Sequence, residues 1–262
     1  MRNEHIDAGK AFDWGRTSDD YAKYRDIYPQ EFYQKILDAG LCTVGGQVLD
    51  IGTGTGVLPR NLYQSGACFT GTDISANQIE QAKKLAATEN MKINFFCTSA
   101  ENSNFTDDTF DTITACQCFF YFNHDVLAPK IYKMLKSGGR LAIFYMAWLP
   151  FEDKIAGESE RLVLKYNPHW SGCKETRHLI EVPAVYQQYF ELEQSEIFDL
   201  QVPFTHESWN GRMKACRGIG ASLTDEEIVQ FDEEHRALLN TIAPKEFEIL
   251  HYTAMCILRV KK

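Results

Sequence analysis

The chain has 262 residues, enough to bury a full hydrophobic core as one large domain or as one domain with a sizeable insertion. Its formal net charge is −9, without a long block of either sign, which disfavours nucleic acid or an anionic membrane surface as the partner. The N-terminal stretch MRNEHIDAGKAFDWG lacks an apolar core, and the longest apolar run, residues 141–149, is too short to span a bilayer. We therefore expect a soluble cytoplasmic enzyme.

Residues 18–40 carry two helical patterns ahead of the first strand-like run. Pro29 separates the two patterns, while Ser18 and Gly40 are residue types that begin and end helices. A pair of short helices is expected here.

Between residues 45 and 146, apolar strand-like runs alternate with helical patterns. This alternation is typical of βαβ units, in which helices cover a parallel sheet. Ser75, followed three residues later by Gln78, predicts a capping box at the start of the second helix. The predicted strands are QVLDIG, CFTGTDI, INFFCTS, FDTITAC and RLAIFYM. The predicted helices are VLPRNLYQSG, SANQIEQAKKLAATEN and HDVLAPKIYKMLKSGG, the last with Leu127, Ile131, Met134 and Leu135 on one face and its end at Gly138.

After residue 146 the pattern changes to an amphipathic helix, EDKIAGESERLVLKY, and an irregular stretch that contains NPHWSGCKETRH. Residues 198–204 alternate apolar and polar side chains, as a strand with one solvated face does. A helix-rich insertion is predicted at 206–243, and FEILHYTAMCILRV is predicted as the closing strand.

The cysteines form no CxxC pair, and five of the eight lie within or beside apolar stretches. We predict that these five are small buried hydrophobic side chains rather than halves of disulfides. The CQC triplet at 116–118 is too short to supply two ligands to a tetrahedral zinc, and no metal site is predicted. The five are Cys68, Cys97, Cys116, Cys118 and Cys256.

A row of glycines, Gly52, Gly54 and Gly56, directly follows the first predicted strand. A dinucleotide-binding loop has the pattern G-x-G-x-x-G, whose third glycine would fall here at Val57. The pattern is instead D-x-G-x-G-x-G, with Asp50 at the end of the strand. Because a carboxylate there repels a pyrophosphate but suits an ammonium or sulfonium, the sign of this charge argues against NAD and FAD.

A second acid, Asp73, ends the next predicted strand, where it can accept hydrogen bonds from both hydroxyls of a ribose. Taken alone, a glycine row is common in α/β proteins, and either acid could be a helix cap or a solvated loop residue. Together, the two acids and the glycines predict a pocket for a nucleoside whose other arm is cationic.

At these residues the sequence resembles the class I S-adenosylmethionine-dependent methyltransferases, and within them the small-molecule branch often called type 11. LDIGTGTG looks like the glycine loop of that family, and Asp73 in GTDIS looks like its ribose-binding acid. TSAENSNFTDDTFD is similar to the adenine-side segment, and MLKSGGRLAIF to the turn into the fifth strand. The resemblance covers residues 18–146 well and the rest in outline.

The resemblance implies an α/β fold with a Rossmann-like open twisted sheet of seven strands, mostly parallel with the last antiparallel, and helices on both faces. It implies a single domain over 1–262, with helical lid insertions that form the substrate site. The expected parts are N-terminal helices at 1–42, a cofactor-binding core at 43–146, lid insertions at 147–190 and 206–243, and a final strand at 247–260.

S-Adenosylmethionine is the cofactor that the resemblance implies, with Ala100 at the adenine edge and Ile74 packed on its ring. Two positions depart from the family pattern: Ser99 stands where an acid is usual, and Gln78 where an apolar residue commonly covers the adenine. The predicted cofactor-binding residues are Tyr21, Arg25, Asp50, Gly52, Thr53, Gly54, Gly56, Asp73, Ile74, Gln78, Ser99, Ala100, Glu101, Cys116 and Gln117.

Methyl transfer from a sulfonium is an in-line displacement, so the protein must align the reacting atoms and exclude water. A base is needed only where the nucleophile carries a proton, and the sequence assigns no catalytic residue. If Arg212 faces the pocket, the acceptor carries a carboxylate or phosphate. The predicted acceptor-binding residues are Tyr121, Trp148, Trp209 and Arg212.

Two alternatives to a small-molecule methyltransferase remain open: a non-catalytic cofactor-binding protein and a nucleotide-dependent oxidoreductase. An RNA substrate is disfavoured because the chain has no basic appendage or aromatic RNA-reading motif. The sequence leaves open the acceptor, the methylated atom and the oligomeric state, a homodimer included.

Overall fold

The computed structural model describes residues 7–13, 16, 23–24 and 26–262 of the chain. It divides into two compact units, each of which is described by itself. The helical unit comprises 1–29, 147–177 and 199–252, and the sheet unit comprises 30–146, 178–198 and 253–262.

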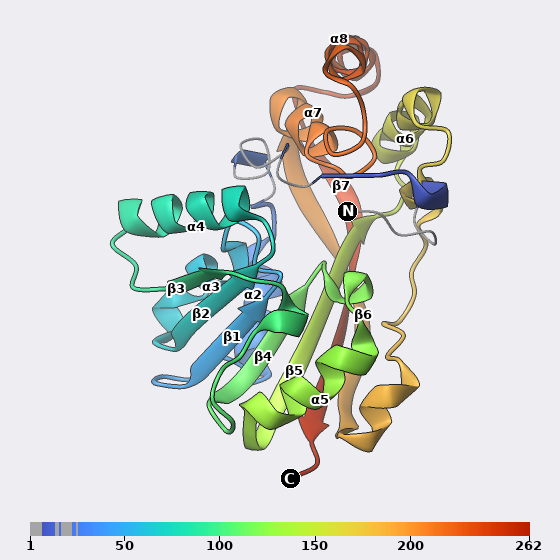
Figure 1. The fold of residues 1–262 in the computed structure, drawn as a ribbon. Coiled ribbons are helices and arrows are strands. Elements are labelled where there is room, and N and C mark those ends of the chain that lie inside the picture. Colours follow the sequence, from blue (N-terminus) through green and yellow to red (C-terminus); the bar gives the residue numbers. More distant parts are fainter. Residues whose placement is uncertain (1–6, 14–15, 17–22, 25) are drawn as a thin grey trace. The chain divides into compact units, whose positions relative to one another are not determined.

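Seven strands form one sheet in the order β3-β2-β1-β4-β5-β7-β6 (Figure 1). β1 pairs in parallel with β2 and β4, β2 with β3, and β4 with β5, whereas the final strand is antiparallel. The order of the strands reverses between β1 and β4, and this reversal opens a crevice at the carboxyl ends of parallel strands. The strands are β1 (Gln47–Ile51), β2 (Cys68–Asp73), β3 (Asn94–Cys97), β4 (Phe110–Cys116), β5 (Leu135–Trp148), β6 (Phe190–Thr205) and β7 (Glu246–Val260).

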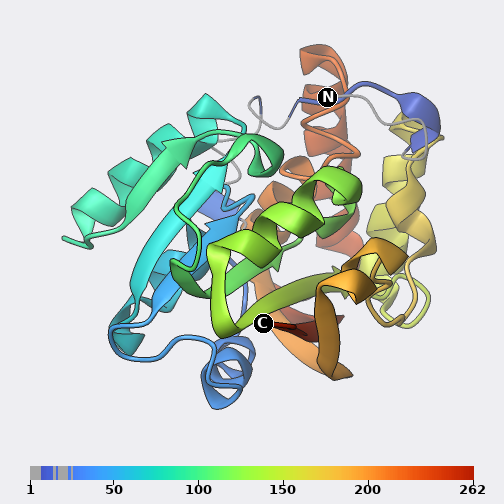
Figure 2. The same ribbon diagram turned by 60° about the horizontal axis from the view of Figure 1, so that its bottom comes forward.

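Helices cover both faces of the sheet unit, as expected. Because successive side chains of a strand point to opposite faces, Ile143 packs in the cluster that contains the buried face of α5 while Phe144 meets Phe32 of α2. Figure 2 shows α5 lying against one face of the strands. The α-helices of this unit are α2 (Gln30–Asp38), α3 (Val57–Asn61), α4 (Ala76–Thr88) and α5 (His124–Met134). Short 3-10 helices are η3 (Tyr63–Ser65), η4 (Ala100–Asn102), η5 (Phe119–Tyr121) and η7 (Ala184–Gln188).

Local sequence signals account for most of these boundaries. The Ser75 side chain accepts a hydrogen bond from the Gln78 N–H at the start of α4, which is one half of the predicted capping box. The Ser75 N–H, which the box would pair with the Gln78 side chain, donates to Asp73 Oδ1 at 2.8 Å. The predicted face of α5 is buried, but the helix ends at Met134 rather than at Gly138, because Leu135 already pairs with Phe110 as the first residue of β5.

The helical unit is built around α6 (Lys154–Tyr166), α7 (His206–Lys214) and α8 (Asp225–Ile242). Capping boxes begin α7 at Thr205 and α8 at Thr224, and the Asp153 side chain caps α6. α8 packs against both α6 and α7. The unit also contains the 3-10 helices η1 (Asp7–Gly9) and η6 (Ser171–Lys174).

A directional chain of buried hydrogen bonds crosses the helical unit. His235 lies with Nδ1 2.8 Å from Asn210 Oδ1 and Nε2 3.0 Å from Ser159 Oγ, and burial lowers its pKa to about 4. Because the Asn210 oxygen can only accept, the neutral ring donates from Nδ1 to Asn210, and Nε2 is left as an acceptor beside the serine hydroxyl, which also donates to the Ile155 carbonyl at 2.8 Å. The serine oxygen in turn accepts from Trp209 Nε1 at 2.9 Å, so that this network specifies how the three helices pack.

The prediction of five buried cysteines is correct for Cys256 and wrong for Cys68 and Cys97, which are exposed. Cys97 is the last residue of β3, an edge strand, and Cys68 is the first residue of β2, so neither lies deep in the sheet. All eight cysteines lie in the described part of the chain, and each is a free thiol.

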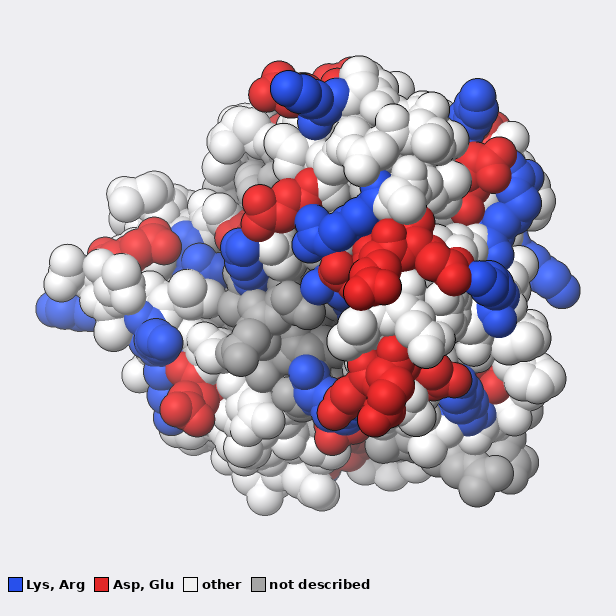
Figure 3. Space-filling view, turned by 90° about the horizontal axis from the view of Figure 1, so that it is seen from above, with Lys and Arg blue, Asp and Glu red and all other residues white. Residues whose placement is uncertain are grey.

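Charged side chains of both signs are interspersed on the face that Figure 3 draws. Among the described residues, no helix has both the length and the apolar character needed to cross a membrane. Of the two helices expected before the sheet, α2 is observed, and the segment of the first falls largely outside the described residues.

Candidate functional site

The loop after β1 has a backbone that requires glycine. Gly52 and Gly56 have φ values of 65° and 73°, in the left-handed region that other residues rarely adopt. A Cβ atom at Gly52 would lie 2.7 Å from Cys118 Sγ, and one at Gly56 would lie 2.7 Å from the Phe95 ring. The loop is therefore pressed closely against its neighbours and presents bare backbone.

Asp73, at the carboxyl end of β2, holds this loop in place. Its Oδ2 accepts a hydrogen bond from the Gly54 N–H at 2.9 Å, and its Oδ1 accepts one from the Ser75 N–H at 2.8 Å. Burial raises the pKa of Asp73, against the lowering effect of these hydrogen bonds. Since a carboxylate oxygen has more than one lone pair, Asp73 keeps the capacity to accept hydroxyl groups of a ligand.

Asp50 lies beneath the loop rather than on it. It aligns with Gly71 of β2 and Thr114 of β4, and its Oδ1 accepts a hydrogen bond from Thr114 Oγ1 at 2.6 Å. Burial raises its pKa to about 6. A cation bound above the loop would favour the ionised form of this carboxyl group. Thr53 is also buried, and its N–H ties the loop to the Thr72 carbonyl at 2.9 Å.

The segments after β2 and β3 lie beside Asp73. Ile74 is 61% exposed, an unusual position for a large apolar side chain unless a ligand covers it. Ser99 Oγ accepts a hydrogen bond from the Asn102 N–H at 3.2 Å, and Glu101 Oε1 accepts one from the Asn123 N–H at 2.9 Å. These two polar side chains are thus engaged with the backbone. Ala100 and Gln78 are buried.

The end of β4 closes the other side of the glycine loop. Cys118 Sγ lies 3.1 Å from the Ile51 carbonyl, and Cys116 is half-buried. Gln117 has a φ of 66°, which is rare outside glycine and marks a constrained backbone. Its side-chain amide donates to the Met146 carbonyl at 2.6 Å, so this group points toward β5.

The predicted acceptor-binding residues fall into the two units separately. Tyr121 lies in η5 of the sheet unit. In the helical unit, Trp148 packs edge-on against Trp209 at 5.3 Å, and the Arg212 guanidinium lies over the Trp148 ring at 4.8 Å. Trp148, Trp209 and Arg212 are all buried. The structure therefore brings these three side chains together. Tyr21 and Arg25 lie outside the described residues.

Sequence reasoning missed a buried acid beside them. Glu160 accepts hydrogen bonds from Trp148 Nε1 at 2.7 Å and from Trp170 Nε1 at 2.5 Å, and burial raises its pKa to about 7. The nearby Arg212 opposes that increase. The signal was present in the sequence, because Glu160 falls on the buried stripe of α6 with Ala156 and Val163.

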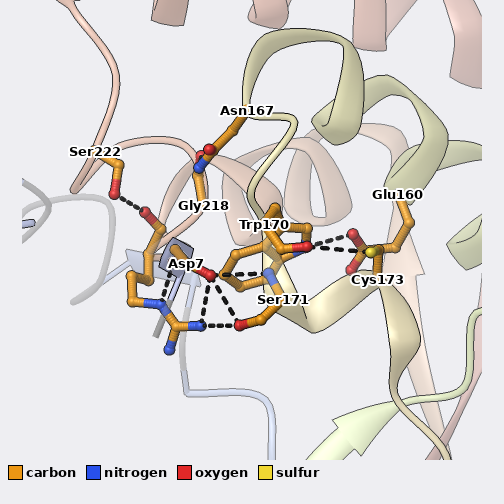
Figure 4. Close-up of polar contacts among 9 residues, drawn as sticks. Asp7, Glu160, Asn167, Trp170, Ser171, Cys173, Gly218 and Ser222 are labelled. Atoms are coloured by element: carbon orange, nitrogen blue, oxygen red, sulfur yellow. Dashed lines mark hydrogen bonds and ion pairs between the residues drawn. The ribbon is translucent and has the colours of Figure 1, made fainter. Parts of the chain in front are cut away.

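A second polar cluster links Arg217 to Asp7 in the N-terminal segment, and Figure 4 shows Asp7, Trp170 and Ser171 of this cluster. Arg217 Nε donates to Asp7 Oδ2 at 2.7 Å, and Asp7 Oδ1 accepts from the Ser171 N–H at 2.8 Å. Burial by itself would raise the pKa of Asp7, but Arg217 and Ser171 hold it below its ordinary value. Arg217 also lies 4.9 Å from the Trp170 ring, so its guanidinium is engaged inside the helical unit.

Comparison with known proteins agrees with the geometry of the loop. Residues 48–139, which contain the glycine loop, Asp73 and the end of β4, match the family described as "Methyltransferase domain". These residues therefore form a methyltransferase domain. Its finer assignment to the type 11 branch stays a prediction.

Two curated methyltransferases illustrate the relationship. The chain is 36% identical over 102 residues to a ubiquinone/menaquinone biosynthesis C-methyltransferase of Desulfotalea psychrophila, covering 36% of this chain and 39% of the relative. It is 32% identical over 111 residues to a ubiquinone biosynthesis O-methyltransferase of Coxiella burnetii, covering 41% and 46%. The chain thus matches less than half the length of these relatives.

The fold extends beyond the matched core. A phosphoethanolamine N-methyltransferase of Haemonchus contortus, solved with phosphomonomethylethanolamine and S-adenosylhomocysteine, superposes with a TM-score of 0.54 at 17% identity. The match covers 92% of this chain and 57% of that chain. At this identity the likeness establishes the fold alone.

Proposed function

We propose that this methyltransferase transfers the methyl group of S-adenosylmethionine to a small-molecule acceptor. The observation that carries the proposal is the hydrogen bond between Asp73 and Gly54, which joins the predicted ribose-binding acid to the predicted cofactor loop. The family of residues 48–139 supports the same cofactor.

The residues present fit this cofactor. A Cβ atom at Gly52 would clash with Cys118 at 2.7 Å, so this position of the proposed cofactor loop must remain without a side chain. Exposed Ile74 offers an apolar surface beside Asp73, as an adenine ring requires. Buried Asp50 supplies a carboxyl group whose ionisation a sulfonium would favour.

When bound, S-adenosylmethionine supplies an electrophilic methyl group on a positively charged sulfur. In our proposal, Asp73 accepts the ribose hydroxyls and the glycine loop positions the chain that leads to the sulfur. Cys116 and Gln117, at the end of β4, form the wall beside the methyl group. These residues contribute by alignment and exclusion of water, which are the main requirements of an in-line displacement.

The acceptor is proposed to be a small molecule rather than nucleic acid or a membrane component. The net charge of −9 and the interspersed charges in Figure 3 support this choice, because polyanionic partners select basic surfaces. Two of the curated relatives are named as methyltransferases of ubiquinone or menaquinone biosynthesis, which supports a small-molecule acceptor. A cytoplasmic location and a homodimer remain predictions.

Calorimetric titration with S-adenosylhomocysteine, followed by a screen of small acceptors with cofactor labelled in the methyl group, tests the proposal. We expect saturable cofactor binding and label transfer to at least one acceptor. Cofactor binding without any transfer would favour the non-catalytic alternative, and binding of NAD in place of S-adenosylhomocysteine would favour the oxidoreductase.

A further inference from the structure

The buried carboxyl group of Asp50 meets a hydroxyl group from the next strand. In the parallel pair of β1 and β4, Asp50 aligns with Thr114, and Thr114 Oγ1 donates a hydrogen bond to Asp50 Oδ1 at 2.6 Å. Figure 1 shows β1 flanked by β4 on one side and by β2 on the other. On the β2 side, Asp50 aligns with Gly71, which has no side chain. Thr114 is therefore the aligned neighbour that pairs with the carboxyl group.

This pair lies in the interior of the sheet unit. Asp50 is 3% exposed and Thr114 is fully buried, as are the adjacent residues of β1, Leu49 and Ile51. Valine has nearly the same shape as threonine without the buried polar atom, so packing alone does not explain a threonine at this position. The hydrogen bond to Asp50 does explain it, because a buried hydroxyl group needs a partner.

The titratable side chains around Asp50 offer no positive charge. They are Asp73 at the end of β2, Cys118 after β4 and Cys42 before β1. Among the described residues, no lysine, arginine or histidine contributes to the pKa of Asp50. Before a cationic ligand binds, the ionised form of Asp50 is thus stabilised by hydroxyl groups rather than by a charge.

Hydroxyl groups favour the ionised form of Asp50. Burial raises its pKa to about 6, while the hydrogen bonds of Thr114 and, to a lesser extent, Thr53 lower it. A hydrogen bond to an ionised acceptor is roughly twice as strong as one to a neutral acceptor, so the donor stabilises the carboxylate more than the carboxylic acid. Near neutral pH the hydroxyl group of Thr114 therefore shifts the balance toward the carboxylate.

We propose that Thr114 is a positioning residue that keeps Asp50 ionised and oriented beneath the glycine loop, where its charge favours the cationic arm of the cofactor. This inference rests on the proposed function, in which the glycine loop positions the chain that leads to the sulfur. Thr114 acts through Asp50 and needs no contact of its own with the cofactor. Because Asp50 comes from β1 and Thr114 from β4, the pair also joins the two strands between which the order of the sheet reverses.

The ionisation of Asp50 is measurable in the protein without ligand. Titration by 13C NMR of protein labelled at the aspartate carboxyl carbons follows each carboxyl group, and the Asp50 signal is the one that Asp50→Asn lacks. We expect Thr114→Val to raise the titration midpoint of Asp50 by about one pH unit, the difference between a charge-assisted and a neutral hydrogen bond. Thr114→Ala removes the hydroxyl group with a smaller side chain and should produce the same shift, so the test does not depend on how valine packs.

Two variants separate the hydroxyl group from the packing of β4. Thr114→Ser keeps the hydroxyl group, and Asp50 should titrate as in the wild type. Thr112 is also buried and lies two positions earlier on the same face of β4, where the aligned residue of β1 is Val48. Thr112→Val should leave the midpoint of Asp50 unchanged. A merely structural role of Thr114 would alter the stability of its variants without moving this titration.

The effect on ligand binding is measured by calorimetry with two ligands that share the adenosine group. S-Adenosylmethionine carries positive charge on its other arm, whereas 5′-methylthioadenosine is uncharged. The ratio of their affinities cancels effects at the ribose, including any titration of Asp73. A midpoint raised from about 6 by one unit lowers the ionised fraction of Asp50 about threefold at pH 6.5. Thr114→Val should therefore lower the preference for S-adenosylmethionine about threefold at pH 6.5 and much less at pH 7.5.

The outcomes distinguish this inference from the function on which it rests. An unchanged Asp50 midpoint in folded Thr114→Val and Thr114→Ala, or an equal shift in Thr112→Val, would overturn the role of Thr114 whether or not the protein binds S-adenosylmethionine. A shifted midpoint with an unchanged affinity ratio would overturn the action of Asp50 on the cationic arm and leave S-adenosylmethionine as the cofactor. Failure of the wild type to bind S-adenosylmethionine would overturn the proposed function itself.

Discussion

The carboxylate of Asp73 accepts a hydrogen bond from the backbone N–H of Gly54 at 2.9 Å, joining the end of β2 to the loop after β1. The acid that is predicted to hold the ribose is therefore also a support of the loop. Its removal acts both on the contacts with the ligand and on the shape of the loop.

Asp73→Ala should weaken S-adenosylhomocysteine binding by roughly 10- to 100-fold, because charge-assisted hydrogen bonds contribute about 1.5–3 kcal/mol. Calorimetric titration measures the change. Asp111→Ala is a matched control, since Asp111 also accepts a backbone N–H of a neighbouring strand, from Gln47 at 2.8 Å. If a folded Asp73→Ala protein binds S-adenosylhomocysteine as tightly as the wild type does, Asp73 supports the loop but does not bind the ligand.

S-Adenosylhomocysteine should stabilise the protein against heat, whereas NAD should not. At a concentration of about 100 times Kd the gain is about 2.7 kcal/mol. For a chain of this length that corresponds to a rise in Tm of roughly 5 to 10 °C. Thermal unfolding with each ligand provides the measurement, and stabilisation by NAD alone would contradict the sign argument at Asp50.

Asp50 should make the binding of the charged cofactor depend on pH. Its pKa is raised to about 6 by burial, so the carboxyl group is largely protonated at pH 5 and ionised at pH 7.5. Only the ionised form attracts a sulfonium, so the affinity of S-adenosylmethionine relative to S-adenosylhomocysteine, whose sulfur is uncharged, should rise over this interval. Asp50→Asn should remove this dependence on pH. If the ratio of the two affinities does not change with pH in the wild type, Asp50 does not interact with the charge on the sulfur.

Glu160 should lower the stability of the protein as pH rises. Its folded pKa of about 7 exceeds the ordinary value of 4.5, so the folded state binds the proton more tightly and stability is lost between about pH 4.5 and 7. The loss is of the order of 3 kcal/mol. Denaturant unfolding from pH 5 to 8 should show a shallower slope in Glu160→Gln, while exposed Glu226→Gln should follow the wild type.

Trp209 should be important for the stability of the helical unit. It is fully buried and donates from Nε1 to Ser159 Oγ at 2.9 Å. Trp209→Ala should therefore cost about 3–5 kcal/mol, whereas Trp209→Phe retains a smaller aromatic ring, loses only the Nε1 donor and part of the packing, and should cost less. Chemical denaturation measures both values. A loss of methyl transfer indicates a contact with the acceptor only in Trp209→Phe, because Trp209→Ala also loses stability. A Trp209→Ala protein as stable as the wild type would contradict the observed packing.

The strands, most helices and the cofactor loop could be predicted from the sequence because each depends on neighbours along the chain. Strand-like apolar runs, the Ser75 cap and the closely spaced glycines are local signals, and the register of parallel strands then brings Asp73 to Gly54. The helix α5 ends earlier than predicted because Leu135 pairs with Phe110, and no local signal in the sequence indicates this pairing.

The tertiary structure alone decided which side chains meet across long separations. It brought the rings of Tyr145 and His178 to within 5.6 Å of each other, and it placed Glu160 between Trp148 and Trp170. It also left Cys97 exposed to solvent, although the apolar stretch beside this residue predicted burial. Burial and contact depend on how complete elements pack, so residue type and periodicity identify the faces of an element but not the partner that covers each face.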